Sequence, residues 1–182
     1  LGERGLWFKM NFFEGSARVP LMIAGQGIAR GLISEPVSTL DINPTLGALA
    51  GIDLTEIAPW TDGENLLPIA TGSPRRHAVP MEYAAEGSIS PLVCLREGPY
   101  KFIHCQSDSP QLYLLDNDPH EMTNLAMDTT YALLVTGFMN KVRSKWDMAA
   151  FDKAVRESQA RRWVVYQALR NGAYYPWDYQ PL

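Results

Sequence analysis

The residues best suited to chemistry gather within the first twenty positions. A lysine and a glutamate, Lys9 and Glu14, lie among glycines and aromatic residues. An apolar run typical of a buried strand follows at residues 18–24, and loops held by a rigid strand are where binding and catalytic groups concentrate. A lysine ammonium in such a loop could stabilise negative charge on a substrate. The residue type alone also fits a surface lysine with a packed stem and a solvated head.

The histidines and cysteines predict no metal site. His77 falls in a polar loop, His104 in a strand-like run and His120 after a turn, and none has metal-ligand spacing with another His, Cys or acid. We therefore assign all three to structure. Cys94 and Cys105 lie in neighbouring strand-like runs and could face each other, but two buried free thiols are the simpler expectation.

Length and composition exclude several classes of protein. The 182 residues suit one domain, or one domain plus a tail. A hydrophobic content of 46% with 20% charged residues is ordinary for a globular protein. The formal charge of −4 leaves no electrostatic footprint for nucleic acid or an anionic membrane, and no apolar run approaches the ~20 residues that cross a bilayer. We expect no nucleic-acid or membrane partner and a cytoplasmic location.

The first eighty residues predict one strand and one helix. The strand is the run at residues 18–24, whose near-continuous apolar character suits a parallel sheet covered on both faces. The helix begins with Asn43 as its cap and Pro44 at its first position, and it ends at Gly51. Residues 53–80 show little periodicity and are predicted to be a long connection, which is often functional in a compact domain.

The remainder predicts an antiparallel unit followed by two helices. Strand-like runs at 92–96 and 100–104 flank a turn at 97–99, and a third run at 111–115 precedes a strong turn at 116–119. Apolar residues at helical spacing predict helices at 130–146 and 150–170. The last segment, residues 171–182, contains four aromatic residues without a helical period, and such a segment usually docks on another surface.

Three segments resemble the sulfatase family. The first, Gly5 to Leu21, is similar to its Gly…Lys…(Tyr/Phe)-Glu-Gly…Arg-Val-Pro-Leu pattern. The second, Leu40 to Ile52, is similar to its Asp-x-x-Pro-Thr-Leu…Ala-Gly helix. The third, Leu112 to Ala126, is similar to its Leu-Tyr-Asp-Leu…Asp-Pro-x-Glu-x-x-Asn-Leu strand and turn, with Leu114 in place of the usual Asp. Residues 2–10 and 175–181 look like bacterial choline-sulfatases in particular.

The resemblance implies an α/β fold: the C-terminal part of a sulfatase-like, alkaline-phosphatase-like sandwich with a small antiparallel-sheet and helix subdomain. The expected division is the end of the α/β core at residues 1–80, the subdomain at 81–170 and an extended aromatic tail at 171–182. The metal-binding Asp-His-Gly of the family would lie upstream of Leu1. The Cys/Ser-x-Pro/Ala-x-Arg motif, from which the family makes its formylglycine nucleophile, does not occur here.

The resemblance also implies a reaction, sulfuric ester hydrolysis, and assigns Lys9 as the catalytic lysine that contacts the sulfate and the formylglycine. A divalent metal ion, Ca²⁺ or Mn²⁺, and the formylglycine are expected outside this chain, because the metal polarises and orients the ester. We therefore expect this chain alone to hydrolyse no sulfate ester. Within the same superfamily, an arylsulfatase or a phosphoester hydrolase is the alternative, and a non-catalytic assembly fragment is a third possibility.

The choline-sulfatase resemblance points to choline sulfate as the substrate. A quaternary ammonium has no hydrogen-bond donor, so its recognition takes aromatic faces and a nearby carboxylate. Residues 80–87 supply Glu82, Tyr83 and Glu86 before a glycine-rich turn. Glu86 is the preferred partner of the ammonium and Glu82 the second choice, while two solvated glutamates remain the alternative. The aromatic tail is expected to lie across a neighbouring subunit of a homo-oligomer.

Overall fold

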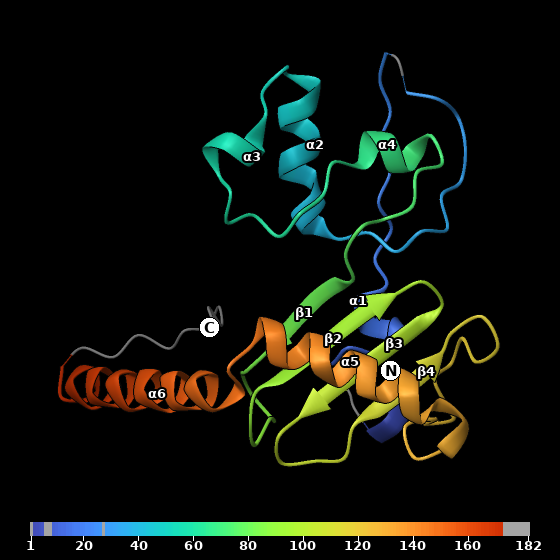
Figure 1. Ribbon diagram of the computed structural model, residues 1–182. Helices are drawn as coiled ribbons and strands as arrows, with labels where there is room; N and C mark the ends of the chain where they lie inside the picture. The colour runs from blue at the N-terminus through green and yellow to red at the C-terminus, as the bar shows by residue number, and fades with distance from the viewer. Residues whose placement is uncertain (1, 6–8, 27, 173–182) are drawn as a thin grey trace.

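The computed structural model describes residues 2–5, 9–26 and 28–172, and its centre is a four-stranded antiparallel sheet (Figure 1). The strands are β1 (Val79–Tyr83), β2 (Leu92–Glu97), β3 (Tyr100–Cys105) and β4 (Gln111–Leu114), and they pair in sequence order. The predicted hairpin is confirmed: Glu97 lies opposite Tyr100, and Gly98 supplies the positive φ of 51° that the tight turn requires.

Each face of the sheet has its own apolar core, as the alternation of a strand demands. Val93, Leu95, Phe102 and Leu112 face helix α5 (Ala132–Lys145), where Phe102 stacks on Phe138 with ring centroids 5.3 Å apart. The opposite face is covered by the N-terminal segment: Phe12 packs against Cys94, Ile103, Tyr113 and Leu115. This segment contains the short helices η1 (Glu3–Gly5) and α1 (Glu14–Ala17).

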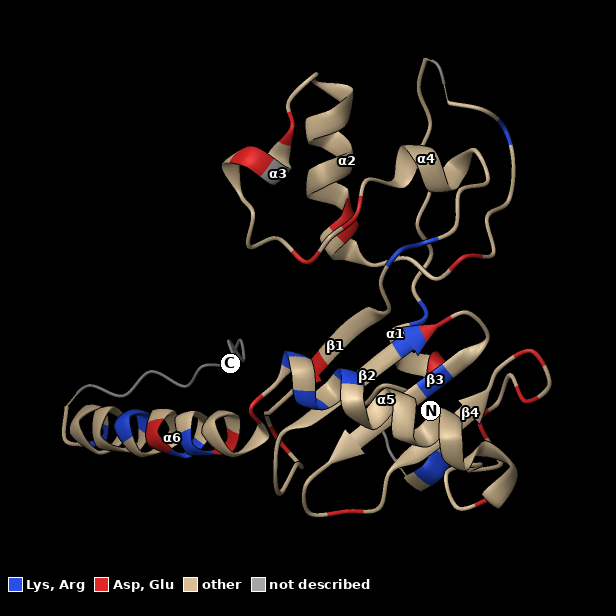
Figure 2. Cartoon of the chain, viewed as in Figure 1, with Lys and Arg blue, Asp and Glu red and all other residues tan. Residues whose placement is uncertain are grey.

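The two long C-terminal helices confirm the predicted periodicity. A turn of 3₁₀ helix, η3 (Thr129–Tyr131), leads into α5, and helix α6 (Met148–Arg170) follows after two residues. Asp147 caps α6 by accepting a hydrogen bond from the Ala150 amide at 3.0 Å. Helix α6 projects away from the sheet (Figure 1) and carries acidic and basic residues along its length (Figure 2). The predicted aromatic tail at 171–182 lies almost wholly outside the described residues.

A second, helical unit lies at the β1 end of the sheet (Figure 1). It contains η2 (Thr39–Asp41), α2 (Ile42–Leu49), α3 (Leu54–Ile57) and α4 (Leu66–Ala70). The predicted cap at Asn43 is wrong. The helical segment begins earlier, at Ser38, whose side chain and Asp41 form a capping box. The segment 53–80, predicted to be a long connection, contains the two short helices α3 and α4 and the start of β1.

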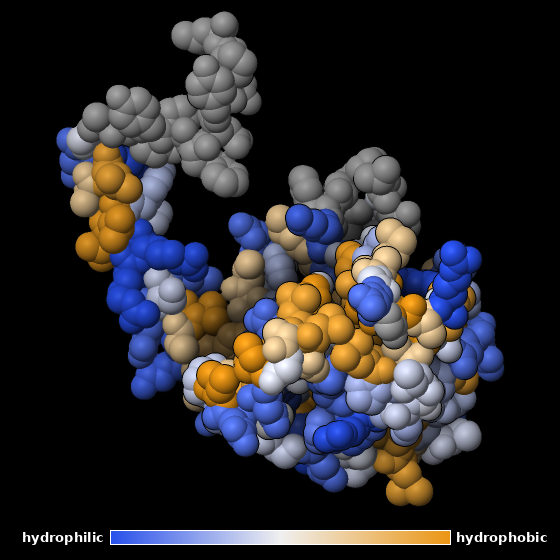
Figure 3. All heavy atoms as spheres, turned by 90° about the horizontal axis from the view of Figure 1, so that it is seen from above, coloured by the Kyte–Doolittle hydropathy of each residue, from blue (hydrophilic) through white to orange (hydrophobic). Residues whose placement is uncertain are grey.

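The predicted strand at 18–24 does not form, and its apolar side chains are exposed: Met22 is 90% exposed and Val19 61%. A strand exists only where a neighbour completes its hydrogen bonds, and none of the described strands lies beside this run. Further exposed apolar residues lie on α2, including Leu46 and Leu49. Seen from above, hydrophobic residues gather over the helical unit and at the outer part of α6 (Figure 3).

Candidate functional site

Lys9 lies on the segment that precedes α1, and its side chain is exposed. Its carbonyl oxygen accepts hydrogen bonds from the Asn11 amide, at 2.9 Å, and from the Ser16 hydroxyl of α1. These contacts tie the backbone at Lys9 to a helix that rests on the sheet. Within the described residues no hydrogen bond or ion pair engages the Lys9 ammonium, so it is available to an incoming anion.

The segment that carries Lys9 is anchored by a buried cluster of charges. Lys101 is fully buried on β3, and its ammonium donates to the carbonyl of Phe12 at 2.7 Å and to the carboxylates of Glu14 at 2.6 Å and Glu121 at 2.7 Å. The second carboxylate oxygen of Glu121 accepts from the Glu14 amide at 2.7 Å. The three donors of the lysine are thus all used. The partners of Glu14 thus come from segments far away in the sequence.

Arg4 adds a second cation beside this cluster. Its guanidinium donates to the carbonyls of His120 and Glu121 and lies 3.8 Å from the centroid of the Phe13 ring. Both Arg4 and Glu121 have left-handed backbones, with φ of 56° and 55°. Burial raises the pKa of the nearby Tyr113 hydroxyl, and Arg4 opposes that rise.

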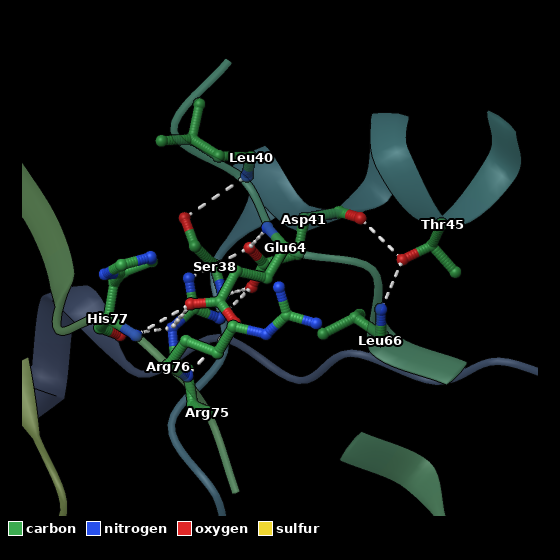
Figure 4. Close-up of polar contacts among 9 residues, drawn as sticks. All are labelled: Ser38, Leu40, Asp41, Thr45, Glu64, Leu66, Arg75, Arg76 and His77. Atoms are coloured by element: carbon green, nitrogen blue, oxygen red, sulfur yellow. Dashed lines mark hydrogen bonds and ion pairs between the residues drawn. The ribbon is translucent and has the colours of Figure 1, made fainter. Parts of the chain in front are cut away.

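A second buried ion pair organises the helical unit (Figure 4). Asp41 is fully buried, and its two oxygens receive the guanidinium of Arg75 at 2.6 and 3.0 Å and the amides of Ser38 and Glu64, both at 2.7 Å. Gly63 lies against this cluster, where an added Cβ would be only 2.1 Å from the Leu40 carbonyl oxygen. Asp41 therefore holds the helical unit together, and its two carboxylate oxygens are already engaged by four donors.

The two predicted substrate-binding glutamates have different surroundings in the structure. Glu82 pairs with Val93, which belongs to the core under α5, and its carboxylate accepts the indole N–H of Trp146 at 2.5 Å. It also lines a small cleft with Asp62 and Lys145. Glu82 thus already has a partner on the α5 face.

Glu86 lies beyond Tyr83, whose ring packs in the opposite core with Phe12 and Phe13. The Tyr83 hydroxyl donates to the Glu86 carbonyl at 2.7 Å. Burial and then the negative charge of Glu86 raise the pKa of Tyr83. The Glu86 side chain is exposed, and no hydrogen bond to it is found among the described residues. The Tyr83 side chain thus holds the backbone of Glu86, and the Glu86 carboxylate is exposed.

A cleft of about 1040 Å³ separates the helical unit from the sheet and α5. Both signs of charge line it, and an ion pair of 2.6 Å between Lys145 and Asp62 joins the two sides. In the part of the chain that the structure describes, no three His, Cys, Asp or Glu residues form a group that could hold a metal ion.

Neither the cysteines nor the histidines form a reactive pair. Cys94 lies opposite Ile103 and Cys105 opposite Leu92, so the two thiols do not face each other, and both are free. Burial raises the pKa of Cys94 far above its ordinary value, which keeps the thiol protonated. His104 is partly buried on β3, and its Nδ1 has no hydrogen-bond partner among the described residues.

Sequence reasoning missed Lys101, Arg4 and Arg75 as organising residues. A signal for Lys101 was present, since it interrupts the apolar run of β3 and a buried lysine must be paired. Its partners could not be read from the sequence, because Glu14 and Glu121 are 107 residues apart.

The comparisons with known proteins define the family. The model described as N-sulphoglucosamine sulphohydrolase, C-terminal, matches residues 2–147, and the one described as choline sulfatase enzyme C terminal matches residues 153–182. The chain therefore belongs to the sulfatase family, as a C-terminal portion. It is 62% identical to a choline-sulfatase of Rhizobium meliloti over 100% of this chain and 36% of that protein.

Two further comparisons agree on the family and the fold. Human arylsulfatase K is 33% identical over 72% of this chain and 27% of its own length. The crystal structure of Ps i-CgsB aligns with a TM-score of 0.53 and 25% identity, over 64% of this chain and 26% of that chain. The expected sulfatase-like α/β class with a small antiparallel sheet and helices is confirmed. The chain spans roughly a third of the length of the relatives it matches.

Proposed function

We propose that the protein containing this chain is a sulfuric ester hydrolase that converts choline sulfate and water to choline and sulfate. The observation that carries the proposal is the 62% identity to a choline-sulfatase across the whole of this chain. The exposed apolar residues of 19–23 and α2 support a chain that packs against a larger α/β body. We expect no turnover from these 182 residues alone.

In this proposal Lys9 supplies a fixed positive charge to the sulfate group. Its ammonium is exposed and unengaged, whereas its backbone is held by Asn11 and Ser16. A preorganised cation of this kind stabilises the negative charge that builds up on the ester oxygens as the bond to sulfur breaks. Lys9 would therefore act in the transition state more than in substrate binding.

The same proposal assigns the choline end of the substrate to Glu86 and Tyr83. A trimethylammonium group is recognised by an aromatic face and a carboxylate. The hydrogen bond from the Tyr83 hydroxyl to the Glu86 backbone carbonyl, which keeps these two residues adjacent, supports the assignment. Glu82 is the weaker choice because Trp146 already occupies its carboxylate. The ammonium contact would set specificity and leave the sulfuryl chemistry untouched.

The family resemblance implies a divalent metal ion, Ca²⁺ or Mn²⁺, and a formylglycine. The described residues of this chain do not fit a metal site, because no group of three or more suitable ligands exists among them. We propose that the metal ligands and the formylglycine belong to the part of the protein that this chain does not span. When bound, such a metal would polarise the sulfate ester.

Two further statements belong to this proposal. The aromatic tail, residues 171–182, lies across a neighbouring subunit of a homo-oligomer, and the protein works in the cytoplasm. Among the described residues no helix is long and apolar enough to cross a membrane. The oligomer proposal comes from the aromatic content of the tail, which has no helical period to bury it.

Steady-state kinetics of the intact protein test the proposed activity. Sulfate release from choline sulfate is compared with turnover of 4-nitrophenyl sulfate and 4-nitrophenyl phosphate. The proposal expects the highest kcat/KM on choline sulfate, together with competitive inhibition by free choline. A higher kcat/KM on the aryl sulfate would favour an arylsulfatase, and one on the phosphate would favour a phosphoester hydrolase. A relative described as a multifunctional alkaline phosphatase superfamily protein, 30% identical, makes the phosphate the necessary comparison.

A further inference from the structure

The two glutamates of separate sulfatase-like segments meet at one lysine. Glu14 comes from the Phe-Glu-Gly stretch and Glu121 from the turn after β4, and both carboxylates bind the Lys101 ammonium within 2.7 Å. Lys101 lies in the register position opposite Arg96 and Tyr113, inside the sheet. Its side chain is 1% exposed and that of Glu121 is 2% exposed, so the contact is shielded from water.

The cluster is balanced in charge when Arg4 is included. Lys101 and Arg4 are cationic, and Glu14 and Glu121 are anionic, so two charges of each sign lie together. A buried ion pair stabilises a fold only weakly compared with apolar residues of similar volume, and its better-attested use is to specify one arrangement. We therefore consider that this cluster fixes the position of the N-terminal segment on the sheet.

The segment fixed by this cluster is the one that carries Lys9. Lys101 holds the Phe12 carbonyl and the Glu14 side chain, and Glu121 holds the Glu14 amide. Glu14 begins α1, and Ser16 of the same helix donates to the Lys9 carbonyl. A continuous series of contacts thus runs from Lys101, near the start of β3, to the backbone of Lys9.

The backbone conformation of Arg4 and Glu121 also indicates that this cluster fixes a functional segment. Arg4 and Glu121 both have positive φ, and the Arg4 guanidinium donates to the Glu121 carbonyl, so the two strained residues contact each other. Non-glycine residues in this region persist only where surrounding structure over-determines them, and they concentrate at functional sites.

We propose that Lys101 is a positioning residue. With Glu14 and Glu121 it fixes residues 9–17 on the sheet, so that the Lys9 ammonium meets the sulfate ester in a single place. This inference rests on the proposed function of Lys9. A displacement of about 1 Å in a positioned group can lower a rate by roughly 100-fold.

A double-mutant cycle in the intact protein tests the coupling of Lys101 to Lys9. Lys101→Met leaves the buried Glu121 carboxylate and the half-buried Glu14 carboxylate without their cation, so the variant chosen to preserve folding is Lys101→Met with Glu14→Gln and Glu121→Gln. The triple variant should lower kcat by at least ~10-fold with KM changed by less than about 3-fold. Lys153→Met is the matched control, because Lys153 is 78% exposed on α6 and its ion pair with Glu157 is long, at 3.9 Å.

The double-mutant cycle distinguishes the positioning role of Lys101 from the catalytic role of Lys9. Lys9→Ala should lower kcat by at least ~100-fold in the otherwise unchanged protein, but by less than about 5-fold in the triple variant, because Lys9 is already misplaced there. Equal losses in both backgrounds would overturn the positioning role of Lys101. A Lys9→Ala variant with unchanged kcat would instead refute the proposed function of Lys9.

Hydrogen exchange supplies a readout that does not depend on activity. In the intact triple variant the amides of residues 14–18 should exchange at least ~10-fold faster, since α1 loses the ion pairs with Lys101 that anchor it to the sheet. Amides of β2 and β3 serve as the internal reference and should keep their protection. Unchanged exchange at residues 14–18 would show that the cluster does not hold this segment.

Discussion

The Arg75 guanidinium donates two hydrogen bonds to the Asp41 carboxylate, from Nη1 to Oδ2 at 2.6 Å and from Nη2 to Oδ1 at 3.0 Å. The two residues are 34 apart in sequence, yet their side chains are 3% and 0% exposed. Asp41 also closes the capping box with Ser38 at the start of the helical segment. One carboxylate thus joins the start of this helical segment, the Gly63–Glu64 loop and the approach to β1.

Removal of one partner should therefore destabilise the helical unit strongly. Arg75→Met leaves the Asp41 carboxylate buried and unpaired, and we expect a loss of about 3–5 kcal/mol in the free energy of unfolding. Urea unfolding of the variant and of the unchanged protein measures this loss. Arg156→Met, which removes an exposed ion pair with Asp152 on α6, should leave the free energy of unfolding almost unchanged. Similar losses for the two variants would mean that the Asp41 pair contributes no more than a surface contact.

The two candidate choline-binding glutamates predict different kinetic signatures. Glu86→Gln should raise KM for choline sulfate by at least ~10-fold and leave turnover of a neutral aryl sulfate within about 2-fold, because the carboxylate contacts only the ammonium. Glu82→Gln should change both substrates alike or not at all, since its carboxylate binds Trp146. The reverse pattern would transfer the ammonium site to Glu82. Equal losses on both substrates for Glu86→Gln would assign it a structural role.

Because His104 is partly buried, we expect the free energy of unfolding to fall on acidification. Burial first, and Arg143 second, lower the pKa of His104 in the folded protein. Below pH ~6.5 the unfolded chain binds the proton more readily than the folded one, so the free energy of unfolding falls with pH down to the folded pKa. Above that window His104 contributes no pH dependence.

A His104→Gln variant should therefore unfold with a weaker pH dependence below pH ~6.5 than the unchanged protein. Thermal unfolding at a series of pH values measures it. His77→Gln is the matched control, because the His77 side chain is exposed and only its backbone joins the Asp41 cluster. A His104→Gln variant with an unchanged pH profile would contradict the effect of burial.

We expect that removal of residues 172–182 of the aromatic tail changes the oligomeric state of the protein. Tyr174, Tyr175, Trp177 and Tyr179 lie outside the described residues, and the sequence around them has no helical period. If they cover a neighbouring subunit, truncation of the intact protein after Asn171 should shift its mass towards the monomer in light scattering. An internal control keeps the length and replaces these four aromatics by serine, and it should give the same shift. A truncated protein that remains an oligomer would place the subunit contact elsewhere.

Local patterns in the sequence determined much of this protein. The hairpin of β2 and β3, strand β4 and the helices α5 and α6 follow from alternation, turn residues and helical spacing, which act between near neighbours. The sulfatase-like segments also identified the family, because their order and spacing are visible along the chain. Strand β1 was missed, since Pro80 weakens the alternation of Val79–Tyr83.

Only the tertiary structure decided which residues meet. The run at 18–24 has the composition of a strand but lacks a neighbour to complete its hydrogen bonds, so no strand forms among the described residues. Glu82 and Glu86 look alike in sequence, and the pleat of β1 places Glu82 towards α5 while the chain carries Glu86 to Tyr83. Lys101 finds Glu14 and Glu121 only after β3 and β4 pair and the N-terminal segment packs on them, because an ion pair depends on distance in space.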